Sequence, residues 1–223
     1  MKKIKLLAGA LLLATSVQAS EYSFEFYSGF VYNMKEDILI RQGAADDIAI
    51  DNANLKTNPT TNPLYYGMRI TKWDGDESAW EFEHLHQKLY IENPEKINPN
   101  LTRWEITDGY NFFFINKAKK INTLGGLVYR YGGGLVITHP DVTIYEKTNH
   151  KQGNGAITAG EGYHLSGFVV QTSIQKEFPI NKKWYFKTEL RATYAQANVP
   201  IADGDMNVRN RALHFNYGVG YKF

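Results

Sequence analysis

The feature that most constrains this chain is an alternation of apolar and polar residues with a period of two. In residues 21–32 the even positions hold aromatic residues such as Tyr22 and Phe24, whereas odd positions hold Ser23 and Glu25. Successive side chains of a β-strand point to opposite faces, so this pattern predicts a strand with one apolar and one polar face. The pattern recurs along the chain and predicts an all-β protein.

Eight such segments follow one another, each of about 10 to 16 residues, which is long enough for a strand to cross a bilayer at a tilt of about 45°. They span residues 21–32, 64–73, 80–91, 104–115, 123–138, 162–178, 184–194 and 213–223. The connections 74–78, 116–122 and 179–183 are short, whereas 33–61, 92–103, 139–161 and 198–208 are long and polar. This layout is typical of bacterial outer-membrane proteins. We predict an eight-stranded antiparallel transmembrane up-and-down β-barrel with short periplasmic turns and long external loops.

A soluble, lipocalin-like barrel is the alternative fold, and it would turn its apolar face inward. Here one face of several strands carries ionised residues that could pair inside a narrow barrel: Glu25, Arg69, Glu81, Glu83, Lys187, Glu189 and Arg191. Trp73, Trp80, Trp104, Trp184 and Tyr221 lie near the ends of predicted strands, as interfacial aromatic residues do. Both features favour the membrane barrel.

Composition excludes several other classes of protein. The chain has no cysteine, which excludes a disulfide scaffold and a thiolate metal site. A net charge of +2 gives no electrostatic reason to expect nucleic acid as a partner. A mean hydropathy of −0.41 argues against a helical membrane protein.

Residues 1–19 have the pattern of a secretory signal peptide. Lys2, Lys3 and Lys5 precede an apolar stretch, and Val17 and Ala19 are small residues at the two positions that a signal peptidase reads. We expect cleavage near Ala19, which would leave residues 20–223 as the barrel. An alternating strand that ends in an aromatic residue, here Phe223, resembles the signal read by the barrel-assembly machinery. The expected location is the bacterial outer membrane.

Four residues near the predicted external rim could form a metal or acid–base cluster: His86, Asp108, His139 and Asp141. The pattern predicts a change of parity in segment 80–91, because Trp80 and Phe82 occupy even positions whereas Leu85 occupies an odd one. A β-bulge near Glu83 and His84 would reconcile them, and it would turn His86, Lys88 and Tyr90 inward. The alternative is a structural role, in which His86 and Lys88 pair with nearby carboxylates.

A serine and a histidine suggest a different chemistry. His164 and Ser166 are two positions apart and share a strand face, and outer-membrane lipid A deacylases carry a similar His-x-Ser. Theirs continues with Asn, whereas Gly167 follows here, and Glu177 belongs to the opposite end of the strand. Hydrogen-bonded polar residues are the favoured interpretation.

Several short runs resemble the lipid A oxidase-like family of small outer-membrane barrels. They are residues 65–69, 83–90, 107–111, 134–142 and 163–167, with Gln171. The resemblance implies the same fold and an oxygen-dependent oxidation of the proximal glucosamine of lipid A. The family often has His where this chain has Asp108.

Our first hypothesis is therefore a barrel that modifies lipid A, or a neighbouring envelope lipid, at its external rim. His86, Asp108, His139 and Asp141 would be catalytic, and Arg69, Lys88 and Asn111 would bind the anionic headgroup. A divalent metal is a possible cofactor of this cluster, and the sequence has no nucleotide, flavin or haem motif. The alternatives are a non-enzymatic structural or binding barrel, a lipid A deacylase and a narrow pore. The expected partners are outer-membrane lipids, including lipopolysaccharide, and the barrel-assembly machinery.

Overall fold

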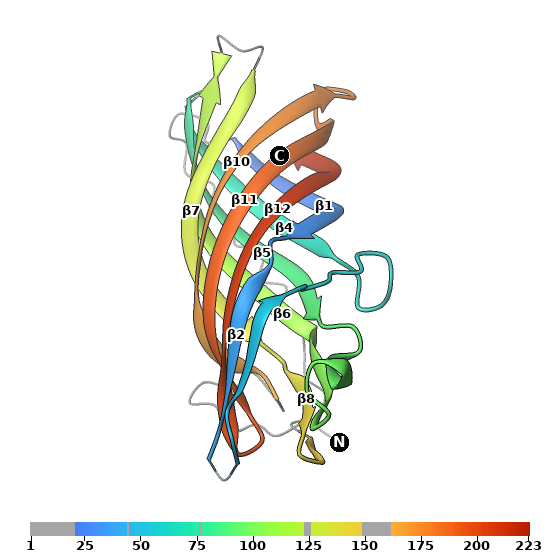
Figure 1. Cartoon of the computed structure of the whole chain (residues 1–223). Coiled ribbons are helices and arrows are strands. Elements are labelled where there is room, and N and C mark those ends of the chain that lie inside the picture. Colours follow the sequence, from blue (N-terminus) through green and yellow to red (C-terminus); the bar gives the residue numbers. More distant parts are fainter. Residues whose placement is uncertain (1–20, 44, 76, 123–125, 149–161) are drawn as a thin grey trace, which may run out of the picture.

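Eight long strands form a closed ring in the computed structural model, which describes residues 21–223 except 44, 76, 123–125 and 149–161 (Figure 1). The ring consists of β1 (Tyr22–Asn33), β4 (Tyr66–Asp74), β5 (Ser78–Tyr90), β6 (Leu101–Ile121), β7 (Leu127–Thr138), β10 (His164–Pro179), β11 (Trp184–Ile201) and β12 (Gly204–Lys222). Neighbours along the chain pair antiparallel, and β1 also pairs with β12 from Ser23–Lys222 to Asn33–Ala212. The predicted eight-stranded antiparallel barrel is confirmed, and the predicted signal peptide lies outside the described residues.

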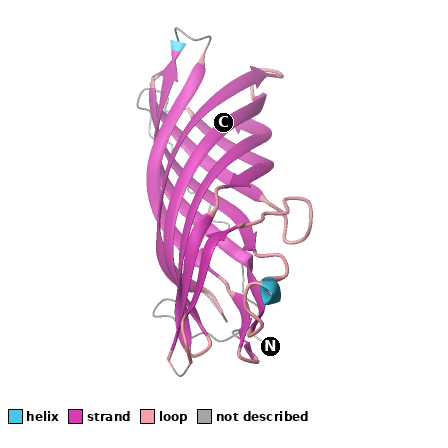
Figure 2. Cartoon of the chain, in the orientation of Figure 1, coloured by secondary structure: helices cyan, strands magenta, loops and turns pink. Residues whose placement is uncertain are grey.

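Shorter elements extend the ring at one end. β2 (Glu36–Gln42) and β3 (Ile48–Ala53) form a hairpin whose first strand pairs with the beginning of β12. β8 (Asp141–Ile144) pairs with the start of β6 and with β9 (Lys147–Thr148). Figure 2 shows how little helix accompanies these strands. The described residues include the 3-10 turn η1 (Pro94–Lys96), and no helix among them is long and apolar enough to cross a membrane.

The two ends of the barrel differ as the sequence predicted. The turns after β4, β6 and β10 gather at the end that is uppermost in Figure 1, and we call it the short-turn end. The β2–β3, β8–β9 and β11–β12 hairpins project from the other end, the long-hairpin end. The prediction of a long loop over residues 198–208 is wrong. β11 runs to Ile201 and β12 begins at Gly204, so only Ala202 and Asp203 form the turn, with Asp203 left-handed at φ 55°.

The outer wall is apolar along most of the ring. Large side chains that alternate with buried ones are exposed there, for example Phe30, Ile70, Phe82, Ile115 and Leu190. The aromatic side chains of Trp80, Trp184 and Tyr221 lie near the short-turn end of this wall. An apolar belt of this kind is what a bilayer requires of a barrel exterior.

The interior is layered along the barrel axis. In the half nearer the long hairpins, large apolar side chains such as Trp104, Tyr110 and Phe112 are fully buried in one cluster. A smaller apolar cluster of Trp73, Ala79, Ala118 and Val128 lies near the short turns. Between the two clusters most of the buried side chains are polar, and many of them are ionised groups or amides.

β5 does not change parity where the sequence suggested. It pairs with β4 without interruption from Asp74–Ser78 to Tyr66–His86, and the register shift opposite β6 comes later, between Gln87 and Leu89. Leu85 and Leu89 are therefore buried in the interior cluster, while His86 shares the outward face with Phe82. The predicted bulge near Glu83 and the inward orientation of His86 and Lys88 are wrong, because the unbroken register with β4 keeps the even positions up to His86 on the outward face, and the Lys88 ammonium contacts Thr61.

Candidate functional site

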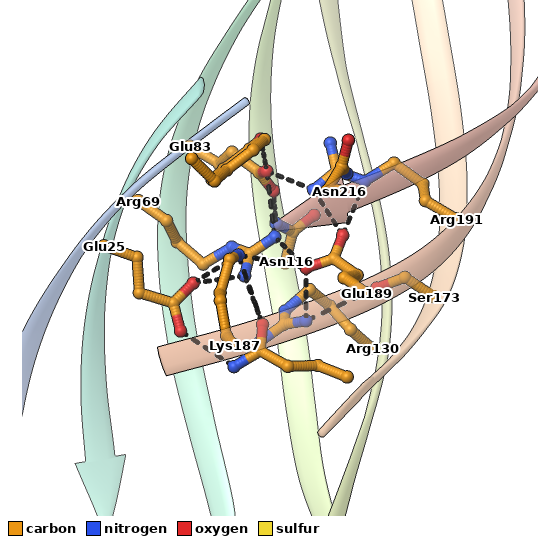
Figure 3. A network of polar contacts seen from close by, with 12 residues as sticks. Glu25, Arg69, Glu83, Asn116, Arg130, Ser173, Lys187, Glu189, Arg191 and Asn216 are labelled. Carbon is orange, nitrogen blue, oxygen red and sulfur yellow. Dashed lines mark hydrogen bonds and ion pairs between the residues drawn. The ribbon is translucent and has the colours of Figure 1, made fainter. Parts of the chain in front are cut away.

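A network of ion pairs closes the middle of the barrel (Figure 3). Its acids are Glu25, Glu81, Glu83 and Glu189, and its bases are Arg69, Arg130, Lys187 and Arg191. All eight residues are at most 3% exposed. The bases and acids balance in charge, which is the condition under which ionised groups tolerate burial.

Arg69 is the centre of this network. Its guanidinium donates to Glu25 at 2.6 Å, to Glu83 at 2.9 Å and to Glu189 at 2.9 Å. The prediction that Arg69 holds an anionic headgroup at the rim is wrong, since its side chain is fully buried among these carboxylates. The prediction that the ionised face of the strands pairs inside the barrel is confirmed.

Amides and an aromatic ring complete the closure. Asn116 and Gln171 donate to Glu83 Oε2 at 2.7 and 2.9 Å. The Tyr27 hydroxyl donates to Glu83, and the Tyr27 ring lies under the ammonium of Lys187, 4.1 Å from it. A Cβ on Gly67 would come within 2.0 Å of that ring, so glycine is needed there. These side chains fill the lumen at this level, as expected for eight strands.

A second polar group faces out of the wall near the long-hairpin end. We call it the lateral cluster, and it consists of Tyr66, His84, His86, Asn111 and Tyr163. His84 Nε2 lies 3.0 Å from Asn111 Oδ1, and its ring stacks on Phe113 with centroids 4.7 Å apart. His86 stacks on Tyr66 at 5.2 Å, and its Nδ1 donates to the Leu64 carbonyl at 2.9 Å.

A small pocket opens beside His84. Its volume is about 200 Å³, and His84, Asn111, Phe113, Ile137 and Tyr163 line it. All five belong to the outward face of adjacent strands or to the segment that enters β10. The pocket is therefore reached from the side of the barrel and not through the lumen.

Asp108 and His139 adjoin the lateral cluster through Tyr163. The Tyr163 hydroxyl donates to the Asp108 carbonyl at 3.1 Å, and its ring packs against His139 with centroids 4.7 Å apart. His139 Nδ1 lies 3.8 Å from Asp108 Oδ2. Burial, and then the Asp108 carboxylate, raise the pKa of the Tyr163 phenol. Tyr163 therefore stays a hydrogen-bond donor at neutral pH.

Two other predicted site residues have structural partners. Lys88 is buried, and its Nζ donates to the carbonyl and hydroxyl oxygens of Thr61 at 2.7 and 2.9 Å. The Asp141 carboxylate pairs with Arg103 at 2.8 Å. The geometry thus brings His86, Asn111, Asp108 and His139 to one side of the rim, while Lys88 and Asp141 have their own local partners.

The serine and histidine of β10 do not form a nucleophile and base. Ser166 Oγ lies 2.6 Å from the Thr138 hydroxyl and 3.2 Å from the His164 carbonyl oxygen, to which it donates. Neither of these two contacts of the Ser166 hydroxyl is with the His164 ring. The favoured interpretation of Ser166 as a hydrogen-bonded polar residue is confirmed.

Sequence reasoning missed His84, Tyr66 and Tyr163 as members of the site. The signal for His84 was present, because an unbroken alternation from Trp80 through Phe82 carries it to the outward face. Tyr163 precedes its strand and had no such signal. Within the described ranges, no group of three or more His, Cys, Asp or Glu side chains is placed to hold a metal ion.

Among the comparisons with known proteins, the solved structures give matches. No protein-family model and no curated protein sequence matches the chain. The solid-state NMR structure of the outer-membrane protein AlkL in DMPC bilayers is similar, with a TM-score of 0.51 and 11% identity over 100% of this chain and 97% of AlkL. Neisserial surface protein A gives 0.43 with 9% identity over 92% and 98%. Ail of Yersinia pestis gives 0.40 with 9% identity over 92% and 100%. The chain thus shares the fold of a small outer-membrane β-barrel protein.

Proposed function

We propose that this chain is an integral barrel of the bacterial outer membrane that binds lipid A at the lateral cluster and modifies it. The apolar belt of the outer wall and the fold shared with AlkL support the membrane location. Because ion pairs fill the middle of the lumen, a substrate would reach the protein from the leaflet around it.

The observation that carries the proposal is that two histidines lie on the outward face of an apolar wall, where His84 is partly exposed and His86 is only 6% exposed. Polar side chains at such positions are unfavourable in a lipid-facing wall unless they have partners or a function. His84 contacts Asn111, His86 contacts the backbone of Leu64 and of Asp108, and a pocket of about 200 Å³ opens beside His84. This is the arrangement expected for a headgroup that arrives laterally.

The chemistry of the cluster suits proton transfer to and from a sugar. A histidine within hydrogen-bond reach of the substrate can accept a proton, and Asn111 would orient the His84 ring. The Tyr163 hydroxyl, which donates to the Asp108 carbonyl, would accept a hydrogen bond from a sugar hydroxyl and so orient the ring. The resemblance to the lipid A oxidase-like family points to oxidation of the proximal glucosamine with dioxygen as the oxidant.

Mass spectrometry of lipid A tests the proposal. Lipid A would be compared between matched cells without the gene, with the gene, and with His84→Ala or His86→Ala. We expect a gain of one oxygen with the wild-type chain and its loss in both variants. Ser166→Ala is the control, and each barrel must be shown to be folded in the outer membrane by its shifted mobility on unheated gels.

A non-enzymatic binding barrel is the second candidate. The observation that favours it is the size of the long-hairpin end, where β2–β3 and β8–β9 add strands beyond the ring. Loops and hairpins held on a rigid scaffold commonly bind partners. Unchanged lipid A in cells that contain the folded wild-type barrel would reject the enzyme and leave this candidate.

A further inference from the structure

The short-turn end carries an excess of lysine. Four lysine side chains of the described residues lie over aromatic rings there. Lys117 is over Trp80 at 4.7 Å, Lys120 over Trp73 at 4.5 Å, Lys183 over Tyr221 at 5.4 Å and Lys222 over Tyr185 at 5.2 Å. Lys72, Lys119, Lys176 and Lys182 are also near these turns. Against these eight cations the described part of this end has four carboxylates, Glu21, Asp74, Glu77 and Glu177.

The opposite end has the reverse balance. The β2–β3 region, residues 35–55, carries two bases, Lys35 and Arg41, and five acids, Glu36, Asp37, Asp46, Asp47 and Asp51. The network in the middle is neutral, because its four acids balance its four bases. Charge is therefore separated along the barrel axis, with the positive side at the short turns.

A pocket at the positive end could hold an anion. Its volume is about 450 Å³, and its lining includes Lys176, Lys182, Lys183, Lys222 and Trp184. Glu177 is the carboxylate of the lining, and it lies 3.5 Å from the Lys222 ammonium, which also lies 3.7 Å from Glu21. The lysines of the pocket outnumber its carboxylate four to one.

We propose that the short-turn end recognises phospholipids with net anionic headgroups in the periplasmic leaflet, in preference to zwitterionic ones. This rests on the membrane location in the proposed function, which places the short turns at that leaflet. Lysines next to a membrane surface gain free energy from anionic lipids, and the aromatic rings hold their ammonium groups at the level of the headgroups. The pocket would receive one phosphate between Lys182 and Lys183.

Spin-labelled lipids test this inference in the folded, full-length chain. The barrel would be reconstituted in phosphatidylcholine vesicles with a trace of spin-labelled phosphatidylglycerol or phosphatidylcholine. Electron paramagnetic resonance then gives the fraction of each label that the protein restricts. We expect the wild-type barrel to restrict phosphatidylglycerol in preference to phosphatidylcholine, and added salt to reduce the preference.

Two double variants with the same net charge distinguish an effect of this surface from an effect of the net charge of the protein. Lys182→Gln with Lys183→Gln should lower the preference by about fivefold for each lysine removed. The matched control, Lys35→Gln with Lys96→Gln, removes two exposed lysines from the long-hairpin end and should retain the preference. Gel mobility would confirm that all barrels are folded.

The outcomes separate this inference from the proposed function. Equal restriction of both labels by the wild-type barrel, or equal losses in both variants, would overturn headgroup recognition and leave the membrane location intact. If neither label were restricted by the folded wild-type chain, the membrane location itself would be wrong, and this inference with it.

Discussion

The central network and the lateral cluster contain polar side chains under opposite conditions. In the network, Arg69 alone contacts three carboxylates within 2.9 Å, and amides such as Asn116 complete the hydrogen bonding. In the lateral cluster His84 contacts Asn111, His86 contacts the backbone of Leu64 and of Asp108, and a pocket opens next to His84. Polar residues that satisfy one another stabilise a closed barrel, whereas polar residues that face outward with spare capacity are available to a ligand.

The largest expected effect comes from breaking the network. Arg69→Met would leave Glu25, Glu83 and Glu189 short of a counter-charge in the interior. The free energy of unfolding should fall by about 3–5 kcal/mol, which urea titration of the barrel in lipid vesicles would measure. Arg41→Gln is the control, because its pair with Asp205 is exposed and contributes about 1 kcal/mol or less. Equal losses in the two variants would contradict the difference between buried and exposed pairs.

A smaller loss should follow from crowding the network. Gly67→Ala adds a methyl group within 2.0 Å of the Tyr27 ring, so the ring and its contact with Glu83 must shift. Overpacking of this kind costs about 1–3 kcal/mol. The same urea titration would measure it. Gly133→Ala is the control, because its new Cβ would make ordinary contacts at 3.5 Å and the free energy of unfolding should change little. Gly75→Ala would be a poor control, since Gly75 has a φ of 63° that favours glycine.

The lateral cluster should lose function before it loses stability. Tyr163→Phe removes the hydroxyl that donates to Asp108. The same hydroxyl would contact the sugar, and a hydrogen bond of this type contributes about 0.5–1.5 kcal/mol, so the rate of lipid A modification should fall by up to about tenfold. Time courses of lipid A composition would give this rate. A loss of barrel folding in this variant would show that Tyr163 is structural.

The smallest effect is expected at Ser166. Ser166→Ala removes hydrogen bonds to Thr138 and to the His164 carbonyl, but no nucleophile. The number of acyl chains on lipid A should be the same with Ser166→Ala as with the wild-type chain. If the wild-type chain removed an acyl chain and Ser166→Ala did not, the deacylase alternative would replace our proposal.

The sequence predicted the ring more accurately than the site. Alternation is a property of each strand alone, so eight segments could be located, and an ionised face that includes Glu25 and Arg69 could be expected to pair inside the barrel. The orientation of β5 could not be predicted in this way, because Leu85 and Leu89 are apolar and yet face the interior. Alternation identifies the outward face only where the interior is polar. At the long-hairpin end the interior is apolar too, and the pattern loses its meaning.

The site also depends on contacts that no local pattern encodes. Asn111 meets His84 through the register of β5 against β6, and Tyr163 reaches Asp108 from a segment 55 positions away. Arg69 was assigned to the rim by its charge, although its strand position belongs with the interior face. The spacing of residues along one strand predicts which face of the strand a side chain lies on. It does not predict how far along the barrel axis that side chain lies.

The pairing of β1 with β12 makes the covalent order of the strands less important than their circular order. The Phe223 amide donates to the Tyr22 carbonyl at 2.9 Å, so the first and last strands meet at the short-turn end. A short linker could join them there, and a break could be made instead in another connection, such as 92–100 between β5 and β6. Such a circular permutant would keep every neighbour in the ring, and with it both the central network and the lateral cluster.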